Sequence, residues 1–549
     1  MEKTAFRWVR RACLAVFLAH GCAAGACADE ADPLQLAFHR QAVRRFVFSQ
    51  EISFGKLVPA EVQALDAMHP TLPTPGAAAA CSYTLAGNTL EVGNAKGGRE
   101  GDSALYVSGV QPYAAYRIDI RSLAEGAEVA AEFASLDRKT RADVVVAGSG
   151  LALRLFKDGQ PVREVPLLAE GVSLPQPPYR LTVELSGVSV AVFATKDERT
   201  VYLGNTDAKS GFGDIVDFRS RAVMAKSTFN LATKVPPGGK VVVGEVAAGL
   251  SSGIGQADIR LVTHANGAPY IEGNRFWYTF SCRGLGTADA WQGVMSIDPS
   301  IFDPRFEGVI VFDRGDGLLR NDYASHVFYD DEAKEWRALT CCFSIAPNGR
   351  GQSGLAFASS KHDPRRGVSV MTEEQFTRDQ FSQSSEDPCL IHDTAVGKWR
   401  LLTSAFAKDG IRAQLFESDN WNGPFVPLAG PVEYDSTGTL IQKLGSKWYV
   451  FSGTNKGPMG AGGVLVYSYP DLAYLGEMKV DLPASVKGGR IWAGVFPLPA
   501  GYPARYMALT MDRFNFTGIK GQNWSYGGLY FYWADTPSIQ GPYEFDETK

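Results

Sequence analysis

The sequence is short of several features that define common protein classes. It has 8 cysteines in 549 residues, and the five beyond residue 28 are irregularly spaced: Cys81, Cys282, Cys341, Cys342 and Cys389. An odd, irregular set does not make a disulfide framework, and no CxxC or Cys/His zinc pattern occurs. We expect these cysteines to serve as small buried apolar residues.

Long apolar runs are also missing. The run ACLAVFLAHGCAAGA (12–26) is shorter than the ~20 residues of a membrane span. It follows a basic segment and precedes the small-residue pattern Ala26-Cys27-Ala28, which predicts a secretory signal peptide over 1–28 with cleavage near Ala28. We therefore expect a secreted or periplasmic protein without a membrane span. A lipid anchor on Cys22 or Cys27 is less favoured, because neither follows a good lipobox.

Clusters of basic residues are lacking as well. The net charge is −5, and it becomes −8 without residues 1–28. Nucleic-acid binding depends on grouped Lys and Arg side chains that contact phosphates. The sequence therefore argues against a nucleic-acid partner.

Glycine and aromatic residues are plentiful, with 58 glycines and 11% aromatics, as in proteins with many short strands and tight turns. Over 76–248, alternating strands such as TLEVGN, AYRIDI, DVVVAG and YRLTVELSG recur about every ten residues, which is typical of a β-sandwich. Their texture resembles the concanavalin-like (laminin-G) jelly rolls. Before them, 29–75 combines apolar residues at helix-like spacing with a Pro-rich stretch, which predicts one or two helices and a linker.

A hairpin motif repeats along the last 300 residues. Its second strand reads WYTFS, WRALT, WRLLT, WYVFS and YMALT, headed by Trp277, Trp336, Trp399, Trp448 and Tyr506 at spacings of 59, 63, 49 and 58 residues. Units of this length with several short strands are typical of a β-propeller, in which each blade covers its neighbours. We therefore predict an all-β protein: an N-terminal β-sandwich, then a five-bladed β-propeller over 249–549. A terminal strand should close the ring, and NWSYGGLYFYWADTP (523–537) is the strongest strand near that end.

The first strand of each blade starts at the central channel, so residues just before it should gather at one mouth. Acids, Arg, His and Trp at such a mouth suit a sugar. The predicted catalytic residues are Asp387, Asp322, Asp258 and Asp435, and the predicted substrate-binding residues are His326, Glu386, His264, Arg260, Arg513 and Trp524.

One blade carries a specific motif. Asp387-Pro388, a short strand, a turn and GKWRLL resemble the blade opening of the five-bladed glycoside hydrolases of families 43, 32 and 130. That resemblance implies a glycosidase with two or three channel carboxylates, one of them a proton donor. Two departures stand out: Ala268-Pro269 replaces the Asp-Pro of the first blade, and Thr437-Gly438 stands where family 43 has its acidic residue.

These observations predict an exported glycoside hydrolase acting on a polysaccharide or oligosaccharide, with no organic cofactor. Some family 43 relatives hold a single ion in the channel, but no ligand cluster in this sequence demands one. Two alternatives remain open, a polysaccharide lyase and a non-catalytic carbohydrate-binding propeller. Two carboxylates at the mouth would favour hydrolysis, and a His/Tyr/Arg cluster without them would favour elimination.

Overall fold

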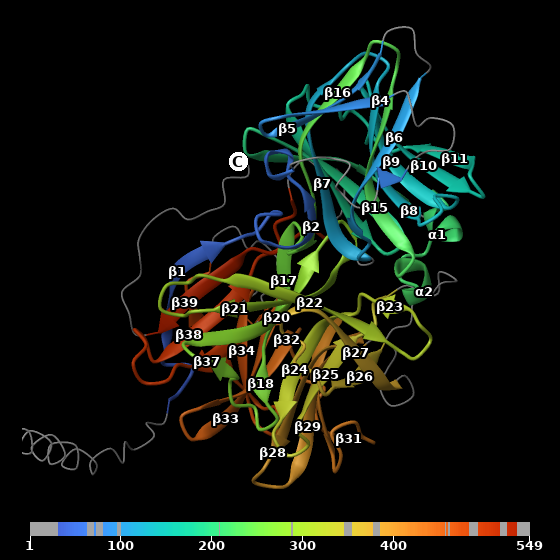
Figure 1. Cartoon of the computed structure of the whole chain (residues 1–549). Coiled ribbons are helices and arrows are strands. Elements are labelled where there is room, and N and C mark those ends of the chain that lie inside the picture. Colours follow the sequence, from blue (N-terminus) through green and yellow to red (C-terminus); the bar gives the residue numbers. More distant parts are fainter. Residues whose placement is uncertain are drawn as a thin grey trace, which may run out of the picture.

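The computed structural model describes residues 31–62, 71–72, 81–95, 100–207, 209–286, 289–344, 354–376, 385–455, 457–458, 462–482, 492, 494–516 and 524–534. The predicted signal peptide lies outside these residues. Figure 1 shows two β-rich parts, one above the other. Within the described ranges, the helices are α1 (Phe212–Ile215), α2 (Arg221–Met224) and the 3₁₀ helix η1 (Pro59–Glu61).

The upper part is a sandwich of two antiparallel sheets, as predicted. The first has the order β11 (Gln160–Pro166), β10 (Gly150–Lys157), β9 (Arg141–Ala147), β8 (Glu128–Ser135), β15 (Ser227–Val235), β6 (Gly101–Gly109) and β3 (Thr71–Leu72). The second has the order β14 (Arg199–Asn205), β13 (Ser189–Lys196), β12 (Tyr179–Ser186), β7 (Tyr113–Leu123), β16 (Lys240–Ser251), β5 (Thr89–Asn94) and β4 (Cys81–Ala86), and β2 (Glu51–Leu57) pairs with β16.

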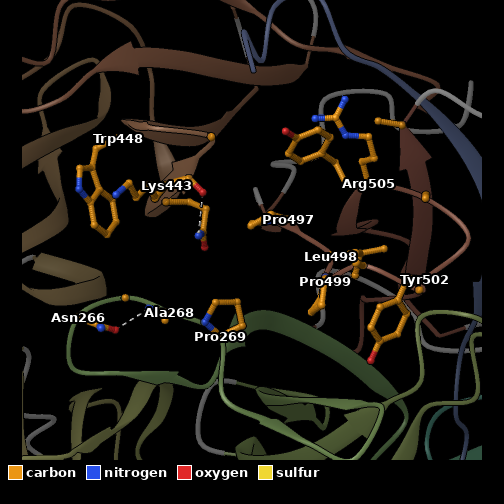
Figure 2. A pocket seen from close by; sticks show the side chains of 18 of the residues that line it. Asn266, Ala268, Pro269, Lys443, Trp448, Pro497, Leu498, Pro499, Tyr502 and Arg505 are labelled. Carbon is orange, nitrogen blue, oxygen red and sulfur yellow. Dashed lines mark hydrogen bonds between the residues drawn. The ribbon is translucent and has the colours of Figure 1, made fainter. Parts of the chain in front are cut away.

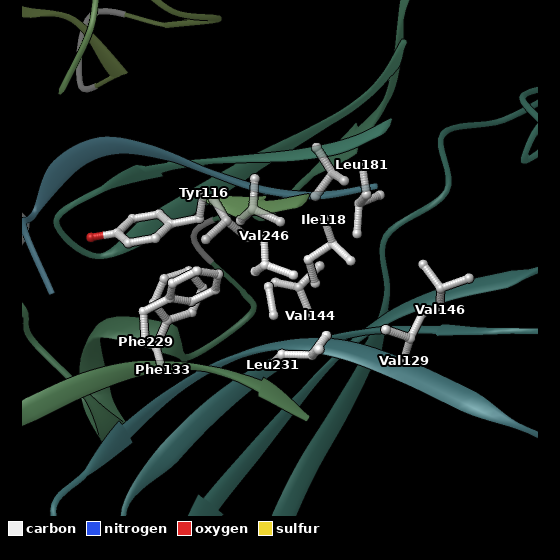
Figure 3. Packing of buried hydrophobic residues seen from close by; sticks show 14 of the residues in the cluster. Tyr116, Ile118, Val129, Phe133, Val144, Val146, Leu181, Phe229, Leu231 and Val246 are labelled. Carbon is white, nitrogen blue, oxygen red and sulfur yellow. The ribbon is translucent and has the colours of Figure 1, made fainter. Parts of the chain in front are cut away.

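Alternate residues of these strands form the sandwich core. Figure 3 shows Tyr116, Ile118 and Leu181 of one sheet above Phe133 and Leu231 of the other, and all are buried. Burying each such side chain stabilises the fold by about 1.5–3 kcal/mol.

The lower part is the five-bladed propeller. The strands of each blade are given with the inner strand first. Blade 1 has β17 (Gly255–Leu261), β20 (Arg275–Arg283), β21 (Trp291–Ile297) and β22 (Arg305–Asp313), and blade 2 has β24 (Tyr323–Asp330), β25 (Glu335–Cys341), β26 (Leu355–Ser360) and β27 (Gly367–Phe376). Blade 3 has β28 (Ser385–Asp393), β29 (Lys398–Ala407), β30 (Gly410–Ser418) and β31 (Val426–Ala429), and blade 4 has β32 (Thr437–Leu444), β33 (Lys447–Thr454), β34 (Gly463–Ser468) and β35 (Tyr474–Glu477). Blade 5 has β37 (Gly494–Pro497), β38 (Tyr506–Met511), β39 (Leu529–Ala534) and β1 (Ala37–Arg44).

Short strands complete these sheets. They are β18 (Thr263–His264) beside β24, β19 (Ile271–Glu272) beside β20, β23 (Leu319–Arg320) beside β22, and β36 (Lys479–Val480) beside β1. Parallel pairing of β22 with β27 joins blades 1 and 2 into one sheet. The five inner strands contact one another in turn around the ring, including β17 with β37. Each predicted aromatic head lies near the start of the second strand of a blade.

The predicted helices of 29–75 are wrong, because β1 and β2 are strands there. β1 pairs antiparallel with β39 and closes the ring (Figure 1), so blade 5 takes a strand from outside 249–549. A register shift between Arg40 and Ala42 interrupts the alternation of β1. Phe38, Gln41 and Ala42 are therefore the buried residues, and this spacing imitates a helix face.

Candidate functional site

Four inner strands share the same local deformation. Each shifts register near its start, and in each a residue has positive φ: Asp258 (52°), Ala324 (57°), Asp387 (58°) and Gly438 (59°). A β-bulge changes the direction in which a side chain points. Residues other than glycine rarely adopt this left-handed backbone conformation. The repeat places two aspartates at equivalent positions of blades 1 and 3.

Asp258, Ala324 and Asp387 border a cavity of about 360 Å³ at one mouth of the channel, and Thr437 borders it next to Gly438. All five blades contribute to its walls. The lining residues are Asp258, Arg283, Tyr323, Ala324, Phe343, Glu386, Asp387, Phe406, Thr437, Asn455, Trp492, Met511, Arg513, Trp524 and Tyr526. Of the predicted site residues, the structure thus brings together Asp258, Asp387, Glu386, Arg513 and Trp524.

Asp258 is 6% exposed, and its carboxyl group has two partners within blade 1. It forms an ion pair with Arg283, and the Ser281 hydroxyl donates to it at 2.6 Å. Arg283 also donates to the Tyr526 hydroxyl at 3.1 Å. Asp258 lies on the inner strand β17 itself. The alignment that put Ala268-Pro269 at the blade opening is therefore corrected: those residues lie beyond β17, in the turn at the other end of the channel.

Asp387 is 4% exposed and has different neighbours. Thr437 Oγ1 and the Gly438 amide donate to its carboxylate at 2.7 and 2.9 Å. Burial raises the pKa of Asp387, and the negative charge of Asp258 raises it further, against the effect of these two hydrogen bonds. The two aspartates therefore interact electrostatically across the cavity.

Arg260 lies beneath the site instead of in its wall. It is 1% exposed and donates to the Thr439 carbonyl and, at 3.3 Å, to the Asp387 carbonyl. Its guanidinium carbon is also 5.2 Å from the centre of a Trp492 ring. Arg260 links blade 1 to blades 3 and 4, so it positions Asp387 from below.

Two predicted residues of blade 2 are outside the cavity. Asp322 accepts hydrogen bonds from Arg314 at 2.8 Å and from the Ser344 amide at 2.7 Å. His326 is buried between Thr263 Oγ1 and the Leu390 amide, each at 3.1 Å, and burial lowers its pKa to about 3. His326 is thus a neutral structural residue, because its ring nitrogens already have partners within the blades.

His264 and Asp435 do not line the cavity either. His264 contacts Asp331 at 2.9 Å and stacks on Tyr270, on the strand leading away from the mouth. Asp435 accepts hydrogen bonds from the Ile411 and Asn455 amides at 2.9 and 3.2 Å. It therefore supports the segment that carries Asn455 into the cavity wall.

The equivalent position of blade 4, Gly438, has no room for a side chain. A Cβ on Gly438 would lie 2.8 Å from the Trp492 ring, and the φ of this residue is +59°. Trp492 occupies the space that an acidic side chain would need, so the site has Glu386, Asp387 and Asp258 as its carboxylates.

The opposite mouth of the channel opens into a wider cavity of about 1000 Å³ (Figure 2). Trp448 and Tyr502 face it from opposite sides, and Pro497 lies between them. Among the described residues that line it, Asp393 is the acidic one, and it accepts a hydrogen bond from Tyr469 at 2.7 Å. Within the described part of the chain, the paired carboxylates therefore lie at the other mouth.

A group of potential metal ligands lies elsewhere in blade 2. Among the described residues, Asp322, Cys342 and Glu373 place ligand atoms within 4.8 Å of one another. Arg314 forms ion pairs with both carboxylates of this group. A guanidinium thus already supplies the positive charge there, and the donor set does not lie at the cavity.

The predicted site residues include five of the fifteen residues that line the cavity. Those predictions came mainly from the residues before each inner strand, but the neighbouring second strand runs antiparallel and ends at the same mouth. Arg283, Phe406 and Asn455 lie at or just beyond such ends, and Tyr526 precedes β39. The signal was present directly after each repeated WxxxS-type strand.

No family model and no curated protein matches this sequence. Among the described residues, no helix is long and apolar enough to cross a membrane.

Solved structures do match. A thermostable family 43 glycoside hydrolase is 13% identical, with 52% of this chain and 95% of that chain covered and a TM-score of 0.35. An α-L-arabinofuranosidase from Podospora anserina, in complex with cellotriose, is 10% identical over 52% and 92% of the two chains, with a TM-score of 0.36. A structure from family 130, described as mannoside phosphorylases containing hydrolases of β-1,2-mannosidic linkages in Candida mannan, is 9% identical over 52% and 87%, with a TM-score of 0.33. These matches include families 43 and 130, which the Asp387-Pro388 motif resembles.

Proposed function

We propose that this protein is a glycoside hydrolase whose catalytic carboxylates are Asp258 and Asp387. The observation that carries the proposal is their arrangement: two buried aspartates from blades 1 and 3 border one cavity in different electrostatic surroundings. Glycosidic hydrolysis needs one carboxyl group that holds a proton and one that is ionised.

The roles follow from the partners. Burial and the charge of Asp258 raise the pKa of Asp387, which favours its acid form, so Asp387 donates a proton to the departing glycosidic oxygen. Asp258, paired with Arg283, acts as the carboxylate that activates water or attacks the anomeric carbon.

The walls suit a sugar at the end of a chain. Phe343, Phe406, Trp524 and Tyr526 offer aromatic faces, and Glu386 and Asn455 offer polar atoms for hydroxyl groups. The cavity measures about 360 Å³, which suits one sugar unit better than a long chain. We therefore infer cleavage from a chain end.

Elimination is the second candidate, because Tyr526 contacts Arg283 and Arg513. A lyase would need a phenolate or imidazole base near the substrate. Burial raises the pKa of Tyr526, although Arg283 opposes this, and both predicted histidines lie outside the cavity. The geometry therefore favours hydrolysis.

A glycan-library digestion tests the proposal. Wild type, Asp258→Asn and Asp387→Asn are compared by release of reducing ends and by ultraviolet absorbance of unsaturated sugars. Asp419→Asn is the control, because Asp419 is 79% exposed on blade 3. We expect reducing ends without absorbance, lowered about 10²–10⁴-fold in the two site variants and unchanged in the control.

The other outcomes of the digestion would support the alternative functions. Absorbance together with reducing ends would identify a lyase. No product from any glycan, with retained glycan binding, would identify a carbohydrate-binding propeller. The predicted signal peptide makes this an exported enzyme in our proposal, and detection of the chain outside the cytoplasm, cleaved near Ala28, tests that part.

A further inference from the structure

The two arginines of the cavity wall are in different electrostatic situations. Arg283 forms its ion pair with Asp258 and is 3% exposed, so its charge is already balanced within the protein. Arg513 follows β38 by two residues and lines the same cavity. No ion pair found among the described residues joins Arg513 to a carboxylate.

The adjacent acid does not serve Arg513. Asp512 accepts hydrogen bonds from the Phe514 and Gly528 amides at 3.1 and 3.0 Å and from the Tyr530 hydroxyl at 2.9 Å. Its carboxylate is thus directed to β39 and the turn before it. The charge of Arg513 is left for whatever enters the cavity.

Arg513 is also oriented for recognition. Its guanidinium carbon lies 4.5 Å from the centre of the Tyr526 ring, and Tyr526 is itself held by Arg283. A guanidinium stacked on an aromatic face keeps its N–H groups in its own plane, at its edges. Those edges match the two oxygens of a carboxylate.

We propose that the sugar bound in this cavity carries a carboxylate, as a uronic acid does, and that Arg513 binds it. This inference rests on the proposed function for its setting, since it names the substrate class of that site. Asp258 and Arg283 offset one another, so Arg513 is the cation of this wall that faces the acid group.

The size of the effect follows from the chemistry of such contacts. A hydrogen bond to a charged group discriminates by about 10- to 150-fold against a partner that lacks the charge. A uronic acid and its neutral hexose differ only in that group. Their affinity ratio therefore isolates the contribution of Arg513.

The test is direct binding to the full mature chain, measured by calorimetry or ligand-observed NMR. The probes are glucuronate and galacturonate beside glucose and galactose. The variants are Arg513→Gln, which removes the charge, and Arg513→Lys, which keeps the charge but removes the planar fork. Arg305→Gln is the matched control, because Arg305 is 61% exposed on the outer strand of blade 1.

We expect at least one uronate to bind about 10-fold or more tightly than its neutral counterpart in wild type and Arg305→Gln. Arg513→Gln should abolish this preference, and Arg513→Lys should retain part of it. A wild type that binds neutral sugars as well as uronates, or binds no uronate up to its solubility limit, would overturn the inference. So would an Arg513→Gln variant with its melting temperature and its uronate preference both intact.

The binding test and the digestion can refute their two hypotheses independently of each other. Cleavage of neutral glycans that depends on Asp258, with no uronate preference, refutes the anionic substrate and leaves the hydrolase standing. Uronate binding through Arg513 without any cleavage refutes the hydrolase and leaves the anionic ligand.

Discussion

Asp258 and Asp387 occupy the same bulged position in two blades, and their neighbours make them chemically different. Asp258 is paired with Arg283, whereas the Asp387 carboxylate accepts hydrogen bonds from the Thr437 hydroxyl and the Gly438 amide, two neutral groups of blade 4. Such a pair separates a proton-holding group from an ionised one without any change of residue type. The division of roles therefore depends on the residues around each aspartate.

The pH profile tests this coupling. Because the charge of Asp258 is one cause that raises the pKa of Asp387, Asp258→Asn should lower that pKa. The alkaline limb of the residual activity then moves to lower pH, measured on a glycoside whose leaving group must be protonated to depart. Asp419→Asn should leave the limb in place. A limb that stays or moves to higher pH in Asp258→Asn would show that Asp387 is not the proton donor.

Gly438 lies in a position where only glycine fits. Its left-handed φ and the nearby Trp492 ring leave no room for a methyl group. Gly438→Ala should lower the free energy of unfolding by about 1–3 kcal/mol, measured by denaturant titration. Gly273 also has a positive φ, but a Cβ added there would have no atom within 4 Å. Gly273→Ala therefore measures the backbone strain without the clash. Equal losses in the two variants would remove Trp492 from the explanation.

At the scale of elements, the N-terminal strand does more than close the ring. Arg45, directly after β1, donates to the carbonyls of Ile254, Phe514 and Ser525 at 3.2, 3.0 and 2.7 Å. Phe514 and Ser525 adjoin Arg513, Trp524 and Tyr526 of the cavity wall. The first strand of the chain thus fixes the residues of the last blade that face the substrate.

Arg45→Lys tests this link, because one ammonium group cannot reach three carbonyls in the same geometry. We expect faster amide hydrogen exchange in 524–534 and a loss of about 2 kcal/mol in the free energy of unfolding. The exposed neighbour Arg44 donates to the Val43 carbonyl, and Arg44→Lys is the control. Unchanged exchange in 524–534 would mean that the wall is held without Arg45.

At the scale of the whole molecule, the sandwich and the propeller meet beside two acidic residues, Glu184 and Asp289, of which Glu184 is buried. Ser189 of β13 donates to Asp289, which precedes β21, at 2.8 Å, and Tyr113 donates to the Leu319 carbonyl at 2.9 Å. Glu184 of β12 is 1% exposed, and neither of its carboxyl oxygens has a hydrogen-bond partner among the described residues. Burial, and then Asp289, raises the pKa of Glu184 well above its usual value.

This burial makes stability depend on pH. The folded state keeps the proton of Glu184 where the unfolded chain has released it, so stability is full below pH ~4.3 and falls as pH rises toward the folded pKa. Glu184→Met removes the group and should raise the free energy of unfolding at pH 7 by about 1–3 kcal/mol.

The same gain should shrink at pH 4, as measured by denaturant titration at both values. Glu125→Met, at an exposed turn, should change stability by less than about 0.5 kcal/mol at either pH. A gain that is equal at both pH values would show that ionisation of Glu184 is not its cause.

The sequence by itself determined the architecture. Alternating strands and five aromatic-headed hairpins suffice for a sandwich and a ring, because a small sheet must bury both faces against neighbours. The same repeat predicted Asp258 and Asp387 as residues of the channel mouth, and both line the cavity.

Only the tertiary structure decided which polar groups meet. Asp322 and His326 lie on either side of the bulged Ala324 of blade 2, yet Arg314 and the Leu390 amide engage them inside the blades. Arg283 and Tyr526 enter the wall through antiparallel neighbours that lie far away in sequence. The closing strand β1 could not be predicted from the sequence for a related reason. A pairing partner about 490 residues away sets its register, and no local pattern encodes that partner.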